Sequence, residues 1–202
     1  MAKHPQRGEN VTIAPGISCR RTNDGQFIFM ATKTGNELYP INCLEDKIMI
    51  FEKQVNGWFL EQAQSLINKR ECGFVVLLVA TAYIEGIEQF RKGTTSNGQN
   101  RDFFIQGIRR IFEIEDENAL KLQDLYSQLR CELFHNGMTG PYIRISSEYE
   151  EPIELSESRI IKINQNKFLE KVKNDFEQYL INLRDKNNQE LRDNFNRIYT
   201  FE

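Results

Sequence analysis

The sequence predicts a mainly α protein, an antiparallel bundle of four to five helices with a small β-hairpin inserted before the last long helix. Two observations predict the bundle. No proline occurs between Pro40 and Pro141, so helices in that window can run without interruption. Apolar residues recur there every three to four positions, which is the spacing of an amphipathic helix. After Gly137 apolar and polar residues alternate instead, which is typical of strands.

Four helices are predicted within the proline-free window, each from the spacing of its apolar residues. The second is apolar on every side for three turns, which predicts that it lies at the centre of the bundle. We therefore expect Val76, Leu77, Ala80 and Ile84 to be almost fully enclosed. The four predicted helices span residues 44–68, 73–91, 101–114 and 117–135.

The chain on either side of this window is predicted to contain three further parts. Isoleucines that alternate with polar residues indicate a β insertion over about residues 141–163. A final long helix is expected from about Lys167. Residues 1–43 are expected to form an extended arm, of at most two strands, outside a helical domain of residues 44–202.

Composition and charge narrow the functional classes. The chain has 202 residues, 40% of them hydrophobic, and a net charge of −3. A protein that coats nucleic acid along its length would carry an excess of basic residues, so this net charge argues against that class. With no Cys-x-x-Cys pair and only two histidines, neither a zinc site nor any other metal or cofactor is predicted. The sequence has neither a signal-peptide pattern nor an uninterrupted apolar run of membrane-spanning length, so a cytoplasmic protein with no membrane partner is expected.

The residues best suited to chemistry lie near the end of the fourth predicted helix, where four residues separate Arg130 from His135. His135 is the only histidine besides His4, and imidazole is the usual proton-transfer group near neutral pH. Arg130 supplies a forked donor suited to phosphate. The alternative is structural, because a solvated arginine and a histidine that offsets a helix dipole can have the same spacing.

The small residues between this arginine and this histidine suggest that a second copy of the chain packs against this helix. On a regular helix that advances ~100° per residue, Arg130 and His135 lie about 140° apart. The small residues Ser127 and Cys131 then lie between them. Such a face allows another helix to approach closely, so we expect a homodimer in which each chain contributes an arginine and a histidine to the site.

Two further residues are candidates for supporting roles. Glu85 appears where the apolar run of the second helix ends, and a carboxylate there can orient an imidazole. The alternative is that this helix simply emerges into solvent at Glu85. Asn136 follows the histidine directly and, with Gly137, marks the predicted end of the fourth helix.

Aromatic and basic residues elsewhere are expected to have structural roles. The aromatic residues Trp58, Phe59 and Phe134 are expected in the core rather than as platforms on which bases stack. Three arginines of the third helix can line an RNA path, although charges on an amphipathic helix more often form its solvated face. These arginines are Arg101, Arg109 and Arg110.

The segment Leu129–Gly137, LRCELFHNG, resembles the signature of the HEPN superfamily, whose helical domains carry an arginine, four to six residues, and then a histidine. The resemblance covers about residues 44–183. It implies a HEPN-like bundle and a metal-independent endoribonuclease of a prokaryotic defence or toxin system, active as a homodimer with its site across the interface. It also implies that Arg130 holds the phosphate and that His135 is the acid/base for attack of the ribose 2′-hydroxyl.

The resemblance leaves a noncatalytic alternative open. In active members a polar Asn, Asp or His often follows the arginine, whereas here the residue is Cys131. Some members are noncatalytic, so the alternative is a HEPN-like dimer that binds RNA, a nucleotide or a partner protein through the same groove. A cognate antitoxin or defence protein is the expected protein partner.

Overall fold

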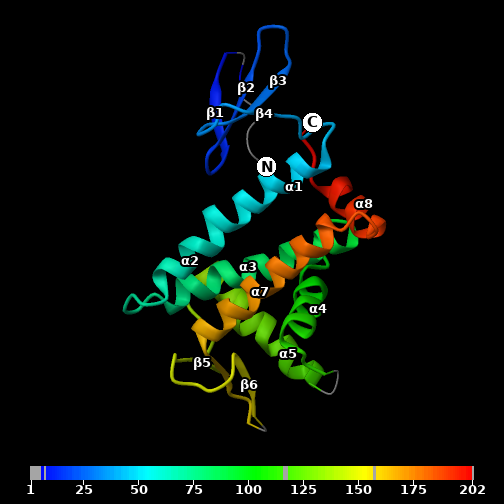
Figure 1. The fold of residues 1–202 in the computed structure, drawn as a ribbon. Coiled ribbons are helices and arrows are strands. Elements are labelled where there is room, and N and C mark those ends of the chain that lie inside the picture. Colours follow the sequence, from blue (N-terminus) through cyan, green and yellow to red (C-terminus); the bar gives the residue numbers. More distant parts are fainter. Residues whose placement is uncertain (1–5, 7, 116–117, 157, 202) are drawn as a thin grey trace.

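The computed structural model describes residues 6, 8–115, 118–156 and 158–201, which form a helical body with a small β-sheet at each end (Figure 1). The tail around His4 and the predicted helix start at Glu117 lie outside the described residues. Two π-helical segments, η1 and η3, interrupt the α-helices. The helical elements are α1 (Leu44–Val55), η1 (Asn56–Leu60), α2 (Glu61–Leu66), α3 (Gly73–Lys92), α4 (Asn100–Phe112), α5 (Ala119–Leu125), η3 (Tyr126–Cys131), α6 (Glu132–Asn136), α7 (Gln165–Arg184) and α8 (Gln189–Ile198).

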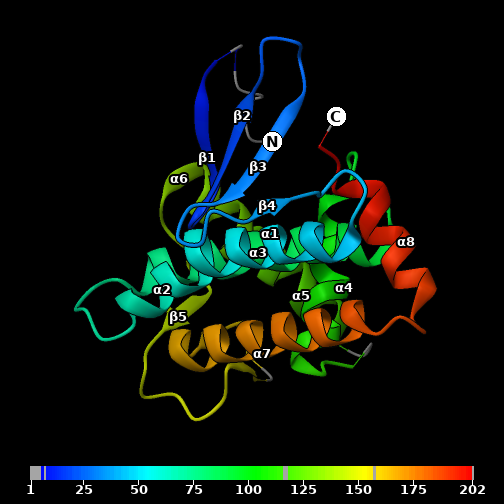
Figure 2. The same ribbon diagram turned by 45° about the horizontal axis from the view of Figure 1, so that its top comes forward.

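Helix α3 runs through the middle of the helical body, and α4, α7 and α8 pack against it (Figure 2). Val76, Leu77, Ala80 and Ile84 have no exposed surface, which confirms the prediction for these residues. The helix ends at Gly93, whose φ of 64° lies in the left-handed region that favours glycine. Its length and composition alone would also suit a membrane span, and 44% of its most apolar stretch is buried inside the protein.

The N-terminal residues form a four-stranded antiparallel sheet, where an extended arm was predicted. The strands follow one another in the order β1-β2-β3-β4. Glycine permits the tight turns between them, since Gly16 and Gly25 adopt φ values of 72° and 92°. Side chains from this sheet form a second apolar core against α1. The strands are β1 (Asn10–Ala14), β2 (Ile17–Arg21), β3 (Phe27–Ala31) and β4 (Glu37–Leu38).

The β insertion lies where the alternating isoleucines predicted it, but it is a three-stranded mixed sheet and not a hairpin. Its order is β5-β7-β6, with β5 parallel and β6 antiparallel to the central β7. Asn164 then caps α7, because its side-chain oxygen accepts hydrogen bonds from the backbone N–H groups of Asn166 and Lys167. The strands are β5 (Ile143–Ile145), β6 (Ile153–Leu155) and β7 (Ile161–Ile163).

The predicted fold class, a helical bundle with one small hairpin, is therefore wrong, although its mainly α part is confirmed. Helical periodicity located the helices, but it carries no information on which short strands pair. The N-terminal sheet also depends on the other end of the chain: the ring of Phe201 lies 5.3 Å from that of Phe29, edge to face. Such contacts between distant parts of the sequence have no local pattern that predicts them.

Candidate functional site

The segment that carries Arg130 and His135 is a continuous but irregular helix made of α5, η3 and α6. In η3 the backbone N–H groups bond five residues back rather than four, so the regular advance assumed for this helix does not hold around Arg130. Single π turns within α-helices are rare and frequently occur at functional sites. The apolar stripe of this helix is nevertheless buried as predicted, at Leu122, Leu125, Leu129 and Leu133.

Three neighbouring side chains hold Arg130 in place. Its Nη2 lies 2.8 Å from Oε2 of Glu85 on α3. Its guanidinium carbon lies 4.5 Å from the ring centre of Phe134 and 5.8 Å from that of Tyr126. Guanidinium groups are attracted to aromatic faces, so these rings restrict the plane of the side chain. The Nε–H group is buried and has no hydrogen-bond partner among the described residues.

Glu85 pairs with Arg130, and the structure places no described contact between Glu85 and His135. The alternative prediction, that α3 emerges into solvent here, is wrong, because Glu85 is only 9% exposed. The side chain of Arg130 is 15% exposed. Two charges this far from water must stay paired, since an unpaired buried charge is costly. Glu85 therefore determines where the guanidinium lies.

His135 is exposed on the last turn of α6, and among the described residues no hydrogen bond or ion pair joins it to Arg130. Its neighbour Asn136 donates a hydrogen bond from Nδ2 to the Glu132 carboxylate within the same helix. The helix ends at Gly137, with φ of 70°. The chain thus presents an anchored guanidinium and a solvent-facing imidazole, which do not form a closed site by themselves.

The small residues predicted between the arginine and the histidine are partly exposed, and each has a contact within its own helix. Ser127 is half-buried, and its hydroxyl donates to the carbonyl oxygen of Asp124 at 3.2 Å. Cys131 is also half-buried and lies beside the Tyr126 hydroxyl. Burial, and then the hydrogen bond with this thiol, raise the pKa of Tyr126, so its hydroxyl stays protonated at neutral pH.

The two rings around Arg130 were not predicted from the sequence. Phe134 was expected in the core, but it is 49% exposed, and Trp58 and Phe59 are also exposed. The spacing offered a signal, because Tyr126, Arg130 and Phe134 follow one another at intervals of four residues. Residues four apart are neighbours on a helix surface, so an arginine between two such aromatic residues predicts stacked contacts.

A second charged cluster joins α3, α4 and α7. Arg110 pairs with Glu88 at 2.7 Å and also with Asp175. Arg91 Nη2 lies 3.2 Å from Asp175 Oδ1, and the Tyr83 hydroxyl donates to Asp175 Oδ2 at 2.8 Å. The two carboxylates are almost fully buried. Because Arg110 is engaged here, it fits a role in joining helices better than the predicted RNA path.

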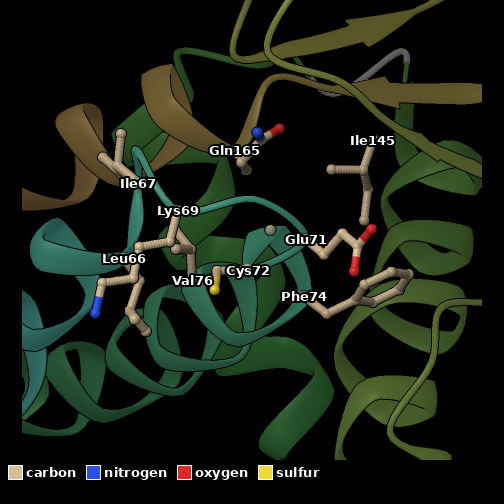
Figure 3. A pocket seen from close by; sticks show the side chains of 10 residues that line it. Leu66, Ile67, Lys69, Glu71, Cys72, Phe74, Val76, Ile145 and Gln165 are labelled. Atoms are coloured by element: carbon tan, nitrogen blue, oxygen red, sulfur yellow. The ribbon is translucent and has the colours of Figure 1, made fainter.

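A cavity of about 280 Å³ lies at the start of α3, where no predicted site residue lines it (Figure 3). Figure 3 shows Cys72 and Val76 between Leu66 on one side and Phe74 and Ile145 on the other. The charged residues of its wall have opposite signs. The full lining consists of Leu66, Ile67, Lys69, Glu71, Cys72, Gly73, Phe74, Val76, Ile145 and Gln165.

No family model, curated protein or solved structure matches this chain. The resemblance to the HEPN signature therefore depends on the segment Leu129–Gly137 alone and stays a prediction. Within the described residues, no group of three or more His, Cys, Asp or Glu side chains is arranged to hold a metal ion. The chemistry available at the candidate site is that of one guanidinium and one imidazole.

Proposed function

We propose that this protein is a metal-independent endoribonuclease that acts as a homodimer, with Arg130 as the phosphate-binding residue and His135 as the acid/base. The observation that carries the proposal is the state of Arg130, which is fixed by its neighbours yet has a buried Nε–H group without a hydrogen-bond partner in the described part of the chain. An unsatisfied buried donor costs about 1–3 kcal/mol, and native proteins retain few of them. A phosphate oxygen can bind the exposed part of the guanidinium, and it supplies the missing acceptor to Nε–H when the side chain shifts toward it.

RNA cleavage by these two groups needs no metal ion. His135 takes the proton of the ribose 2′-hydroxyl as its oxygen attacks the adjacent phosphorus. Arg130 offsets the negative charge that grows on the phosphate oxygens during attack. The imidazolium formed in this way then donates its proton to the leaving 5′ oxygen, so the products end in a 2′,3′-cyclic phosphate and a 5′-hydroxyl. The resemblance of Leu129–Gly137 to the HEPN signature supports the same pair of roles.

A second protomer would complete the site. Within one chain the guanidinium faces α3 while the imidazole faces solvent, so a substrate phosphate needs a histidine from elsewhere or a rearranged His135. In the proposed dimer, a twofold axis close to η3 and α6 brings the His135 of one protomer beside the Arg130 of its partner, since such an interface uses the same surface on both chains. A defence or toxin role, with a cognate protein partner, is part of this proposal.

The ribonuclease activity is tested by incubating the purified protein with single-stranded RNA in excess EDTA. We expect cleavage to persist and to yield 2′,3′-cyclic phosphate ends. Arg130→Ala and His135→Ala should each lower the rate by about a hundredfold or more, the usual loss for an oxyanion donor or an acid/base. His4→Ala removes the other imidazole and should cleave like the parent. Undiminished cleavage by His135→Ala would exclude this mechanism.

The dimer is tested by light scattering on the purified protein, which should report twice the mass of one chain. Ser127→Phe should weaken this dimer, because a bulky ring there keeps a second helix from approaching η3, while the buried leucine stripe is left intact. Circular dichroism checks that this variant keeps its helices. A monomer at high micromolar concentration would contradict the shared site.

A second candidate function is binding without cleavage, and the Glu85 carboxylate favours it. This carboxylate offsets the charge of Arg130 that would stabilise a reacting phosphate. In this case the same surface binds RNA, a nucleotide or a partner protein and leaves it intact. RNA should then raise the melting temperature of the parent but not of Arg130→Ala, because a ligand stabilises only the state that binds it. Cleavage in EDTA separates the two candidates.

A further inference from the structure

The exposed ring beside Arg130 has no part in the proton and phosphate chemistry. Phe134 lies on α6 with 49% of its surface exposed. A single exposed apolar residue is ordinary in a soluble protein. Phe134 differs because the guanidinium of Arg130 lies 4.5 Å from its ring centre. One face of the ring therefore lies against the guanidinium, and about half of the residue's surface remains open to solvent.

We propose that Phe134 is the stacking platform for the nucleobase next to the scissile phosphate, so that the site takes single-stranded RNA. This inference rests on the proposed function, because it adds a substrate contact to the same site. Ring and guanidinium touch each other, so a nucleotide whose phosphate meets Arg130 has its base within reach of the open face of Phe134. Aromatic faces bind bases of any sequence, since every base has a π-face.

The negative charge of the protein implies that base stacking contributes much of the affinity for RNA. Phosphate contacts normally supply most of the affinity for nucleic acid. Here the protein carries a net charge of −3, and Glu85 offsets the arginine of the site. An apolar contact with the base adds affinity to the weakened phosphate contact of Arg130. Bases in a duplex are already stacked and paired, so only an unpaired base can use this ring.

The inference is tested with three replacements of Phe134 and RNA binding measured by fluorescence anisotropy. Phe134→Ala and Phe134→Leu should raise the Kd and the KM for single-stranded RNA by about fivefold or more, the loss typical of one stacked base. Phe134→Trp should retain tight binding, because it keeps an aromatic face. Annealing the complementary strand should abolish the difference between the parent and Phe134→Leu.

An abasic nucleotide at the cleaved position links the ring to the base. It should weaken binding to the parent by the same factor as Phe134→Leu and have little further effect on that variant, since the two changes remove one contact. Phe59 supplies the matched control, because it is equally exposed but lies on η1. Phe59→Leu should bind RNA like the parent.

The outcomes separate this inference from the proposed function. If Arg130→Ala loses RNA binding while Phe134→Leu keeps it, the stacking role is overturned and the ribonuclease proposal stands. A parent that neither binds nor cleaves RNA overturns both. A Phe134→Leu variant that scatters light as a monomer, when the parent is a dimer, overturns the stacking role as well, because the ring then belongs to the protein interface.

Discussion

Val76→Asp should unfold the protein or lower its free energy of unfolding by about 4 kcal/mol or more, because it places a carboxylate without a partner in the centre of the core. Val76 has no exposed surface on α3, the helix against which α4, α7 and α8 pack. Small domains have a total stability of roughly 5–15 kcal/mol, so this loss removes a large part of it. Denaturant titration followed by circular dichroism measures the effect.

The preceding residue provides a matched control for this change. Val75 is 46% exposed on the same helix. Val75→Asp makes the same chemical change one position away, but the carboxylate can remain in water, so the stability should change by only about 0.5 kcal/mol. Equal melting temperatures for Val76→Asp and the parent would contradict the central position of α3.

Asp175→Ala should lower the free energy of unfolding by roughly 3 kcal/mol, within the range for breaking a buried ion pair. Its carboxylate pairs with both Arg91 and Arg110 and accepts a hydrogen bond from Tyr83. The substitution leaves two arginines to share Glu88. We expect the lower end of that range, because solvent still reaches about a third of the Arg110 side chain.

Two further substitutions serve as controls: one removes only the charge of Asp175, and the other removes an exposed aspartate. Asp175→Asn keeps an oxygen that can accept the Tyr83 hydrogen bond but removes the charge. It should therefore fall between the parent and Asp175→Ala. Asp193→Ala removes an exposed aspartate of α8 that bonds only to Gln189 in the contacts described, and should leave the stability almost unchanged. If Asp175→Ala matches Asp193→Ala, the cluster does not join the three helices as we infer.

The candidate site was predictable only in part. The types and positions of Arg130 and His135 are readable along the chain, because few residues besides histidine transfer protons near neutral pH. The role of Glu85 was not, since its partner depends on how α3 crosses the η3 segment. The exposure of Phe134 was also missed. An apolar residue beside a leucine stripe looks like core until the neighbouring elements are placed.

The sequence by itself determined where the main helices run and that α3 and the leucine stripe of α5, η3 and α6 are buried. Helix α3 spans Gly73–Lys92 where residues 73–91 were predicted, since an unbroken apolar run has to be enclosed. Only the tertiary structure decided that β1–β4 form one sheet and that Phe201 packs against it. The same holds for the parallel pairing of β5 with β7 and for the contact of Arg130 with Glu85. Helix formation depends on neighbours three and four residues away, so it appears in the sequence as a periodic pattern of apolar residues. These contacts join residues far apart in the chain and produce no such pattern.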